Sequence, residues 1–211
     1  MNWTEYQKHW VGKTIKSFMG HKATVRKFDG IEVLDFRKPD SAFYAVRVVF
    51  DNERSRVYIS GDIGEAVIYP TCPATLQDMA ECFTCRDDDG TIRVNTEYFL
   101  EKVRATSDRY IWDSKSFEED FRMHCTTYSI EGADSFLEHN GWLKGGISVD
   151  EVRGITLSPR ARDDLKRMDA DYLVWFYDCG KRVSVRIIAW LVALRLAYEA
   201  IKAVAKTKEE V

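Results

Sequence analysis

Two cysteines separated by two residues, Cys82 and Cys85, form the most recognisable chemical pattern in this sequence. The same gap occurs in half of a tetrahedral zinc site and in thioredoxin-like redox pairs. His124 and Cys125 would supply two further ligands. A second cysteine pair with this gap is missing, and cysteines packed inside a fold produce the same pattern. We therefore expect no metal and no cofactor, with zinc binding at Cys82 and Cys85 as the alternative.

The other residue types that perform catalysis are scattered along the chain. Four histidines fall in separate predicted segments: His9, His21, His124 and His139. No serine or cysteine lies in a nucleophile-elbow motif. The adjacent carboxylates Glu118 and Glu119 point to different faces of a helix, which suits solvation better than acid–base catalysis. We predict no catalytic residue; a hydrolase or nuclease with a site in the acidic middle of the chain is the less favoured alternative.

A glycine corner, Ser60 to Glu65, follows a predicted strand, where backbone N–H groups can approach a phosphate. The segment matches neither the GxGxxG fingerprint nor a P-loop, because no Gly-Lys-Ser/Thr follows it. A tight turn in which Asp62 bonds to its own backbone is the simpler interpretation. We expect a turn here, with a ligand-binding loop as the alternative.

Charge is nearly balanced over the whole chain but unevenly distributed along it. The 31 Lys and Arg face 34 Asp and Glu, which excludes a strong overall field for nucleic acid or membranes. Residues 61–150 carry 8 basic and 18 acidic residues, between two mildly basic ends. The basic residues predicted to contact nucleic acid or a partner are Arg26, Lys27, Arg47, Arg54, Arg56, Arg182 and Arg186. The acidic residues predicted to meet a basic groove on a partner are Asp87, Asp88, Asp89, Glu118, Glu119 and Asp120. Solvated surface is the alternative for both sets.

The pattern of residues 1–73 predicts a helix followed by an antiparallel sheet of four or five strands. Apolar residues recur at helical spacing from Trp3 to Met19, and Gly20 ends the helix. Asp29-Gly30 stands between two runs rich in β-branched and aromatic residues, which is a strong hairpin signal. A two-residue turn there places Val25 opposite Leu34.

The remainder reads as mostly helical, so the predicted fold class is α+β, with all parts packed as one unit. Residues 74–157 form an acidic, mostly helical middle whose segment 129–157 is the loosest, and residues 158–211 form the C-terminal helices. A heptad-like seam in the last helix predicts burial or a homodimer: Ile187, Leu191, Leu194, Tyr198 and Ile201.

Neither a membrane span nor an export signal is expected. The longest apolar run, from Ile187 to Leu194, is far shorter than the roughly 20 residues that a span needs. The start of the chain has no apolar signal stretch, and the number of cysteines is odd, at five. We therefore expect a cytoplasmic protein with reduced thiols.

Four segments resemble small proteins carried by phages and mobile elements of Firmicutes. They are the opening helix and the blocks HKATVRKFDGIEVLDFRKPDS, RVYISGDIGEAVIYP and DYLVWFYDCGKRVSVRIIAWLVALRLA. Some proteins of that setting are type II anti-CRISPR proteins, which inhibit Cas9. The resembling segments contain no catalytic signature, and residues 84–157 lie outside them.

The resemblance implies a phage- or element-encoded inhibitor of a host defence nuclease that acts by binding in the bacterial cytoplasm. Its partner would be a Cas9-type complex or the guide RNA or DNA of that complex. The absence of a catalytic constellation from the sequence also favours binding. A nucleic-acid-binding protein without an inhibitor role is the alternative. The resemblance brings no binding residue with it, so the candidate residues are those chosen above by charge.

Overall fold

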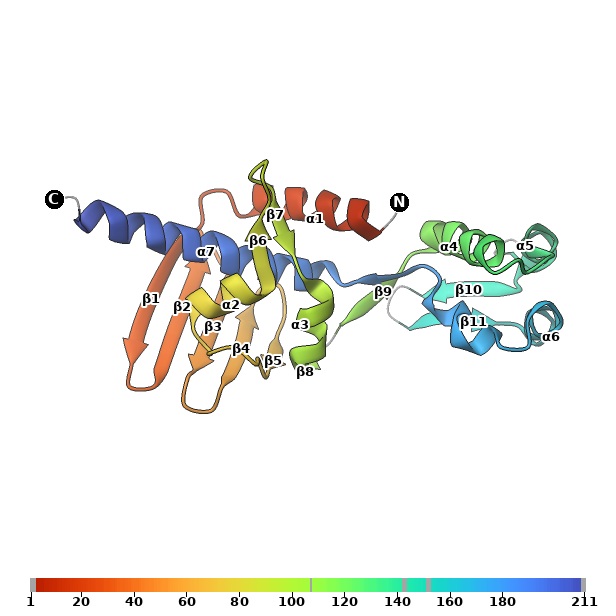
Figure 1. Ribbon diagram of the computed structural model, residues 1–211, viewed down its shortest axis with the longest axis horizontal. Helices are drawn as coiled ribbons and strands as arrows, with labels where there is room; N and C mark the ends of the chain where they lie inside the picture. Colours follow the sequence, from red (N-terminus) through yellow and green to blue (C-terminus); the bar gives the residue numbers. More distant parts are fainter. Residues whose placement is uncertain (1–2, 107, 142–143, 151–152, 210–211) are drawn as a thin grey trace. The chain divides into compact units, whose positions relative to one another are not determined.

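The computed structural model describes residues 3–106, 108–141, 144–150 and 153–209 of the chain (Figure 1). These residues form two compact units. The inserted unit is one continuous stretch, Tyr110–Val183. The sheet unit consists of Asn2–Arg109 and Ser184–Val211, so its two parts are far apart in the sequence.

The sheet unit begins with helix α1 (Trp3–Ser17) and is built around six antiparallel strands. In their order across the sheet they are β1 (Lys22–Phe28), β2 (Ile31–Arg37), β3 (Val46–Asp51), β4 (Arg56–Gly61), β5 (Ala66–Ile68) and β8 (Val103–Thr106). The predicted α+β class and the N-terminal helix are confirmed. The sheet has six strands, however, rather than the four or five that the sequence predicts.

The hairpin at Asp29-Gly30 forms with the predicted register. Val25 pairs with Leu34 and Phe28 pairs with Ile31. Gly30 has a φ of 68°, which glycine adopts without the strain that a Cβ would cause. The local turn chemistry is therefore sufficient to set this part of the sheet.

The middle of the chain is a mixture of helices and small sheets, so the prediction of a mostly helical region is wrong. Helix α2 (Leu76–Phe83) leads into a hairpin of β6 (Thr84–Arg86) and β7 (Ile92–Val94). Helix α3 (Thr96–Lys102) then ends early, because Val103 pairs with Ile68 of β5 and is buried there. Pairing with a distant strand outweighs the helical pattern of this segment.

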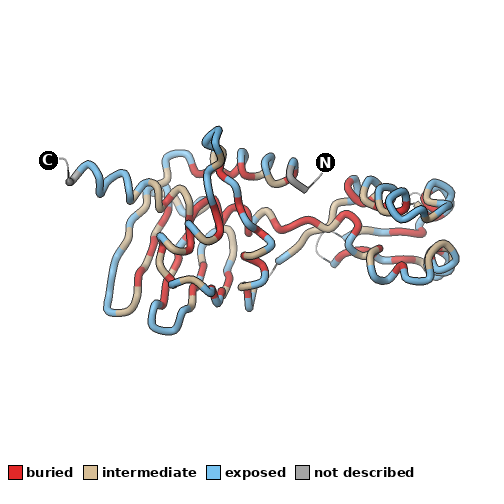
Figure 2. Tube along the Cα trace, viewed as in Figure 1, coloured by how far each residue is buried: buried red, intermediate tan, exposed pale blue. Residues whose placement is uncertain are grey.

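One face of the six-stranded sheet is covered and the other is open, as the alternating burial along the strands shows (Figure 2). The covered face contributes these buried side chains to the core: Leu34, Phe36, Val46, Val48, Phe50, Val57, Ile59, Ala66 and Ile68. The long C-terminal helix α7 (Val185–Glu209) packs against α1, α2 and β1. Within the described ranges no helix is both long and apolar enough to cross a membrane.

The inserted unit has its own core and its own small sheets. Strand β9 (Tyr110–Trp112) pairs with β12 (Lys181–Val183), and β10 (Ile147–Asp150) pairs with β11 (Gly154–Leu157). Its helices are α4 (Ser114–Thr127), α5 (Ala133–Asn140) and α6 (Pro159–Met168), followed by two short 3-10 turns (Tyr172–Val174 and Phe176–Asp178). The largest buried side chains of this core are Phe117, Phe121, Phe176 and Leu165. The segment predicted to be loosest therefore contains a helix and a β-hairpin.

Candidate nucleic-acid interface

Two arginines meet at one aspartate on the open face of the sheet. Asp35 lies on β2, with Arg26 on β1 and Arg47 on β3 at either side of it. The Arg47 Nε donates to Asp35 Oδ1 at 2.7 Å, and the Arg26 Nη2 donates to Asp35 Oδ2 at 2.9 Å. These bonds, that of Arg47 foremost, hold the pKa of Asp35 below its usual value. The trio keeps one net positive charge and fixes both guanidinium groups on the surface.

A second cluster on the same face combines arginines with tyrosines. The guanidinium carbon of Arg56 lies 4.8 Å from the ring centre of Tyr69, and that of Arg104 lies 5.7 Å from it. The pKa of Arg56 is raised, chiefly by a hydrogen bond with Tyr58. Neither arginine forms an ion pair with a carboxylate among the described residues. Their charge is therefore available to a ligand.

We call the surface formed by these side chains the arginine–tyrosine face, and its members are Arg26, Arg47, Arg56, Tyr58, Tyr69 and Arg104. Tyr58 is 37% exposed and Tyr69 is 38% exposed. Half-buried Val33, Val49 and Val67 continue the row of Tyr58 across the sheet. Guanidinium groups bind phosphates, and exposed aromatic rings stack on bases, so this combination is suited to nucleic acid.

Three other predicted basic residues lie outside the arginine–tyrosine face. Arg54 is in the β3–β4 loop and binds Asp51. Lys27 is at the edge of the opposite face, where its Nζ lies 3.3 Å from the buried carboxylate of Glu32. Arg186, at the start of α7, forms an ion pair with Asp108.

The seventh predicted basic residue, Arg182, is in the interior of the inserted unit and is only 5% exposed. Its Nη1 and Nη2 donate to the two carboxylate oxygens of Asp120 at 2.7 and 3.1 Å. Asp120 also accepts the backbone N–H of Gly180 at 2.8 Å. Arg182 and Asp120, which the sequence assigns to opposite binding surfaces, thus bind each other and stabilise the unit.

The predicted acidic residues divide between the two units. Asp87, Asp88 and Asp89 form the β6–β7 turn of the sheet unit, whereas Glu118 and Glu119 lie on α4 of the inserted unit. Asp87 binds Arg93, and both Asp87 and Asp89 accept the N–H of Thr91. Hydrogen bonds with Asp87 and Thr91 lower the pKa of Asp89 to about 2. Asp87 and Asp89 therefore hold the structure of the turn.

The glycine corner is fixed to the neighbouring β2–β3 loop. Asp62 Oδ2 accepts the N–H of Tyr44 at 2.8 Å, and the N–H of Asp62 donates to the carbonyl of Ala45. Gly61 has a φ of 133°, and a Cβ there would lie 2.2 Å from the Ala45 oxygen. The turn that the sequence predicts is present, but Asp62 bonds to a distant backbone group rather than to its own.

The four residues considered for zinc are divided between the two units. Cys82 lies on α2 and Cys85 on β6 of the sheet unit, whereas His124 and Cys125 lie on α4 of the inserted unit. Among the described residues, no three His, Cys, Asp or Glu side chains are grouped to hold a metal ion. His124 instead stacks on Trp175 with ring centres 4.0 Å apart, and desolvation lowers its pKa.

We expect Cys85 to react first when the folded protein is treated with an alkylating reagent, because it is exposed and the thiolate is the reactive form. Burial raises the pKa of Cys72 and of Cys179 to about 12, and it raises the pKa of Cys125 as well. Brief treatment with iodoacetamide at pH 8, followed by peptide mass spectrometry, measures the order. The same treatment in guanidinium chloride is the control. Labelling of Cys179 as fast as Cys85 would contradict this expectation.

Comparison of the chain with protein-family models, with curated proteins and with solved structures found no match. The candidate interface is therefore inferred from the positions and charges of its own side chains. Arg26, Arg47 and Arg56 are predicted from the sequence, whereas Arg104 and both tyrosines are not. The signal that was present for Tyr58 is its position two residues after Arg56 in a strand, which places both side chains on one face.

Proposed function

We propose that this chain is a nucleic-acid-binding protein that acts without catalysis through the arginine–tyrosine face. The observation that carries the proposal is the charge of the open face. The alternate positions that point to it in β1 to β4 include five cations, Lys22, Arg26, Arg37, Arg47 and Arg56, against two carboxylates, Asp35 and Asp51. Arg104 adds a sixth cation from β8. A phosphate backbone is the ligand that such a surface favours.

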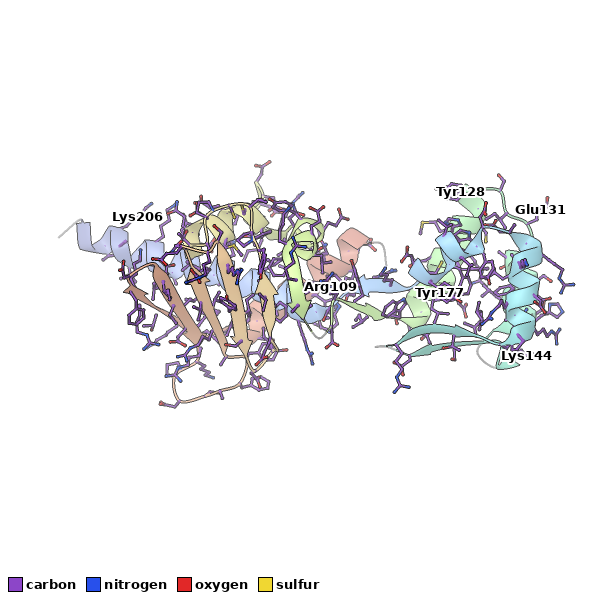
Figure 3. The ribbon with its side chains drawn as sticks, turned by 90° about the horizontal axis from the view of Figure 1, so that it is seen from below. Arg109, Tyr128, Glu131, Lys144, Tyr177 and Lys206 are labelled. Atoms are coloured by element: carbon purple, nitrogen blue, oxygen red, sulfur yellow. The ribbon has the colours of Figure 1, made fainter. Side chains whose placement is uncertain are left out.

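Single-stranded nucleic acid fits this surface better than a duplex. Tyr58 and Tyr69 are partly exposed between cations, and the sheet offers a broad surface on which unpaired bases can stack. A duplex hides the faces of its bases, so only its phosphates would meet the arginines. Side chains on the strands of the sheet are drawn in Figure 3.

We also propose a setting for this binding, namely inhibition of a host defence nuclease of the Cas9 type. The observation that favours it is that two of the segments that resemble phage and mobile-element proteins form strands of the six-stranded sheet. The block that starts at Arg56 covers β4 and β5, and the block that starts at His21 covers β1 and β2. Binding of the guide RNA or the exposed target strand would keep the nuclease from engaging its target.

Reversing two charges should strongly weaken the binding of a labelled single-stranded oligonucleotide. We expect Arg56→Glu/Arg104→Glu to weaken binding more than tenfold and to make the negative slope of log K against log salt shallower by about 1.4, since each lost phosphate contact contributes about 0.7. Fluorescence anisotropy at several salt concentrations measures both quantities. The matched control is Arg162→Glu/Lys166→Glu, which changes the charge equally at two exposed positions of α6.

Four results would contradict these proposals. Equal loss of binding in both double variants would mean that only overall charge matters. Salt-independent binding, or none, would exclude the arginine–tyrosine face as a nucleic-acid site. Inhibition is tested by target cleavage by a Cas9-type complex with increasing amounts of this protein, and unchanged cleavage would contradict it. Multiple-turnover chemistry on DNA or RNA would exclude action by binding alone.

A further inference from the structure

A groove of about 650 Å³ lies at the β4–β5–β8 end of the open face. Its lining includes Tyr58, Ser60, Glu65, Val67, Ala105 and Thr106. Val67 and Ala105 are paired across β5 and β8, and Tyr58 is paired with Val67, so apolar surface and an aromatic ring come together here. This volume is in the range of pockets that take small organic ligands, about 300–1,000 Å³.

The polar groups of the groove are few and lack partners. Glu65 is exposed and forms no hydrogen bond or ion pair within the described ranges. Thr106 pairs with Ala66 of the covered face and its hydroxyl oxygen is buried, so this hydroxyl is not open to a ligand in the groove. Ser60 lies directly opposite Arg47 of the arginine–tyrosine face. The groove thus combines a stacking surface, an unpaired carboxylate and a neighbouring guanidinium group.

The carboxylate of Glu65 requires an explanation in a nucleic-acid site, because its negative charge repels phosphate. An ionised carboxylate only accepts hydrogen bonds, and it can accept two side by side. Guanine presents two adjacent donors, N1–H and the N2 amino group, on its Watson–Crick edge. Adenine, cytosine and uracil each place an acceptor beside a donor on that edge, so one oxygen of the carboxylate would face another lone pair.

We propose that this groove binds an unpaired guanine base, which stacks on Tyr58 and donates N1–H and N2–H to the carboxylate of Glu65. The proposal rests on nucleic-acid binding by the arginine–tyrosine face and adds base selection to it. Arg47 is positioned to meet the phosphate that adjoins the bound nucleotide. The hydroxyl group of Ser60 is a further hydrogen-bonding group of the groove.

Oligonucleotides that differ at one base test this assignment. The probes are single-stranded nine-residue uridine oligomers with a central guanine, adenine, cytosine or hypoxanthine, and the corresponding thymidine oligomers. We expect the guanine oligomer to bind about tenfold more tightly than the adenine oligomer, as a bidentate contact to a base allows. Hypoxanthine keeps N1–H but lacks the amino group, so its affinity should fall between these two. Similar preferences in the RNA and DNA series would show that the base alone is read.

The variant Glu65→Gln separates the groove from the rest of the surface. Its amide presents a single oxygen acceptor, so we expect the guanine preference to disappear while the all-uridine oligomer binds at least as tightly as before, since one negative charge is removed. Glu53→Gln, at an exposed position of the β3–β4 loop, is the control and should keep the preference. Equal affinity for all four bases, or a preference that survives Glu65→Gln, would overturn the assignment and leave nucleic-acid binding intact. Failure of every oligomer to bind would overturn both.

Discussion

Asp120→Ala should destabilise the inserted unit by about 3–5 kcal/mol, the cost of leaving the buried charge of Arg182 without its carboxylate partner. The Arg182 side chain is only 6% exposed and donates two hydrogen bonds to Asp120. Without the carboxylate, a guanidinium group that always carries its charge is left in the interior. The backbone N–H of Gly180 loses its acceptor at the same time.

The matched control for this prediction is Asp134→Ala in the same unit. Asp134 also binds an arginine, Arg122, at 2.8 Å, but its side chain is 86% exposed. Removing an exposed pair of this kind costs about 1 kcal/mol or less. Urea unfolding followed by circular dichroism and by tryptophan fluorescence measures both variants. Equal costs for Asp120→Ala and Asp134→Ala would show that burial of the arginine does not determine the contribution of its ion pair.

The parts of the fold that the sequence predicts well are those determined by neighbouring residues. Asp29-Gly30 determines a turn by its own backbone preferences, and the strands on either side of it then pair by position. Ser158 before Pro159 predicts the start of α6, and Ser158 Oγ accepts the N–H of Ala161 as an N-cap should. Both signals lie within four residues of the feature that they determine.

The parts that could not be predicted depend on contacts between distant segments. Val103 lies in a segment with a helical pattern, yet it becomes part of β8 because β5 offers an unpaired edge. Arg182 and Asp120 are 62 residues apart, and no local pattern indicates that they meet. Arg104 joins the arginine–tyrosine face only because β8 completes the sheet, so the same missed strand explains the missed site residue.

The long helix α7 is expected to be the element on which the stability of the sheet unit depends most. Its seam residues Ile187, Leu191 and Leu194 are completely buried, whereas Tyr198 and Ile201 are half-buried. The helix packs against α1, α2 and β1, which come from the other end of the sequence. A loss of packing on this seam therefore weakens several elements at once.

Leu191→Ala should lower the free energy of unfolding of the sheet unit by about 2–5 kcal/mol, because it removes buried methyl groups and leaves a cavity. The value should fall in the upper part of that range, since a residue with 0% exposure has neighbours on every side and the cavity cannot fill with water cheaply. Val204→Ala on the same helix is the control. Val204 is 56% exposed, and alanine has the higher helix propensity, so this change should be nearly neutral. Thermal unfolding by circular dichroism compares the two variants, and an unchanged melting temperature for Leu191→Ala would mean that the seam does not support the sheet.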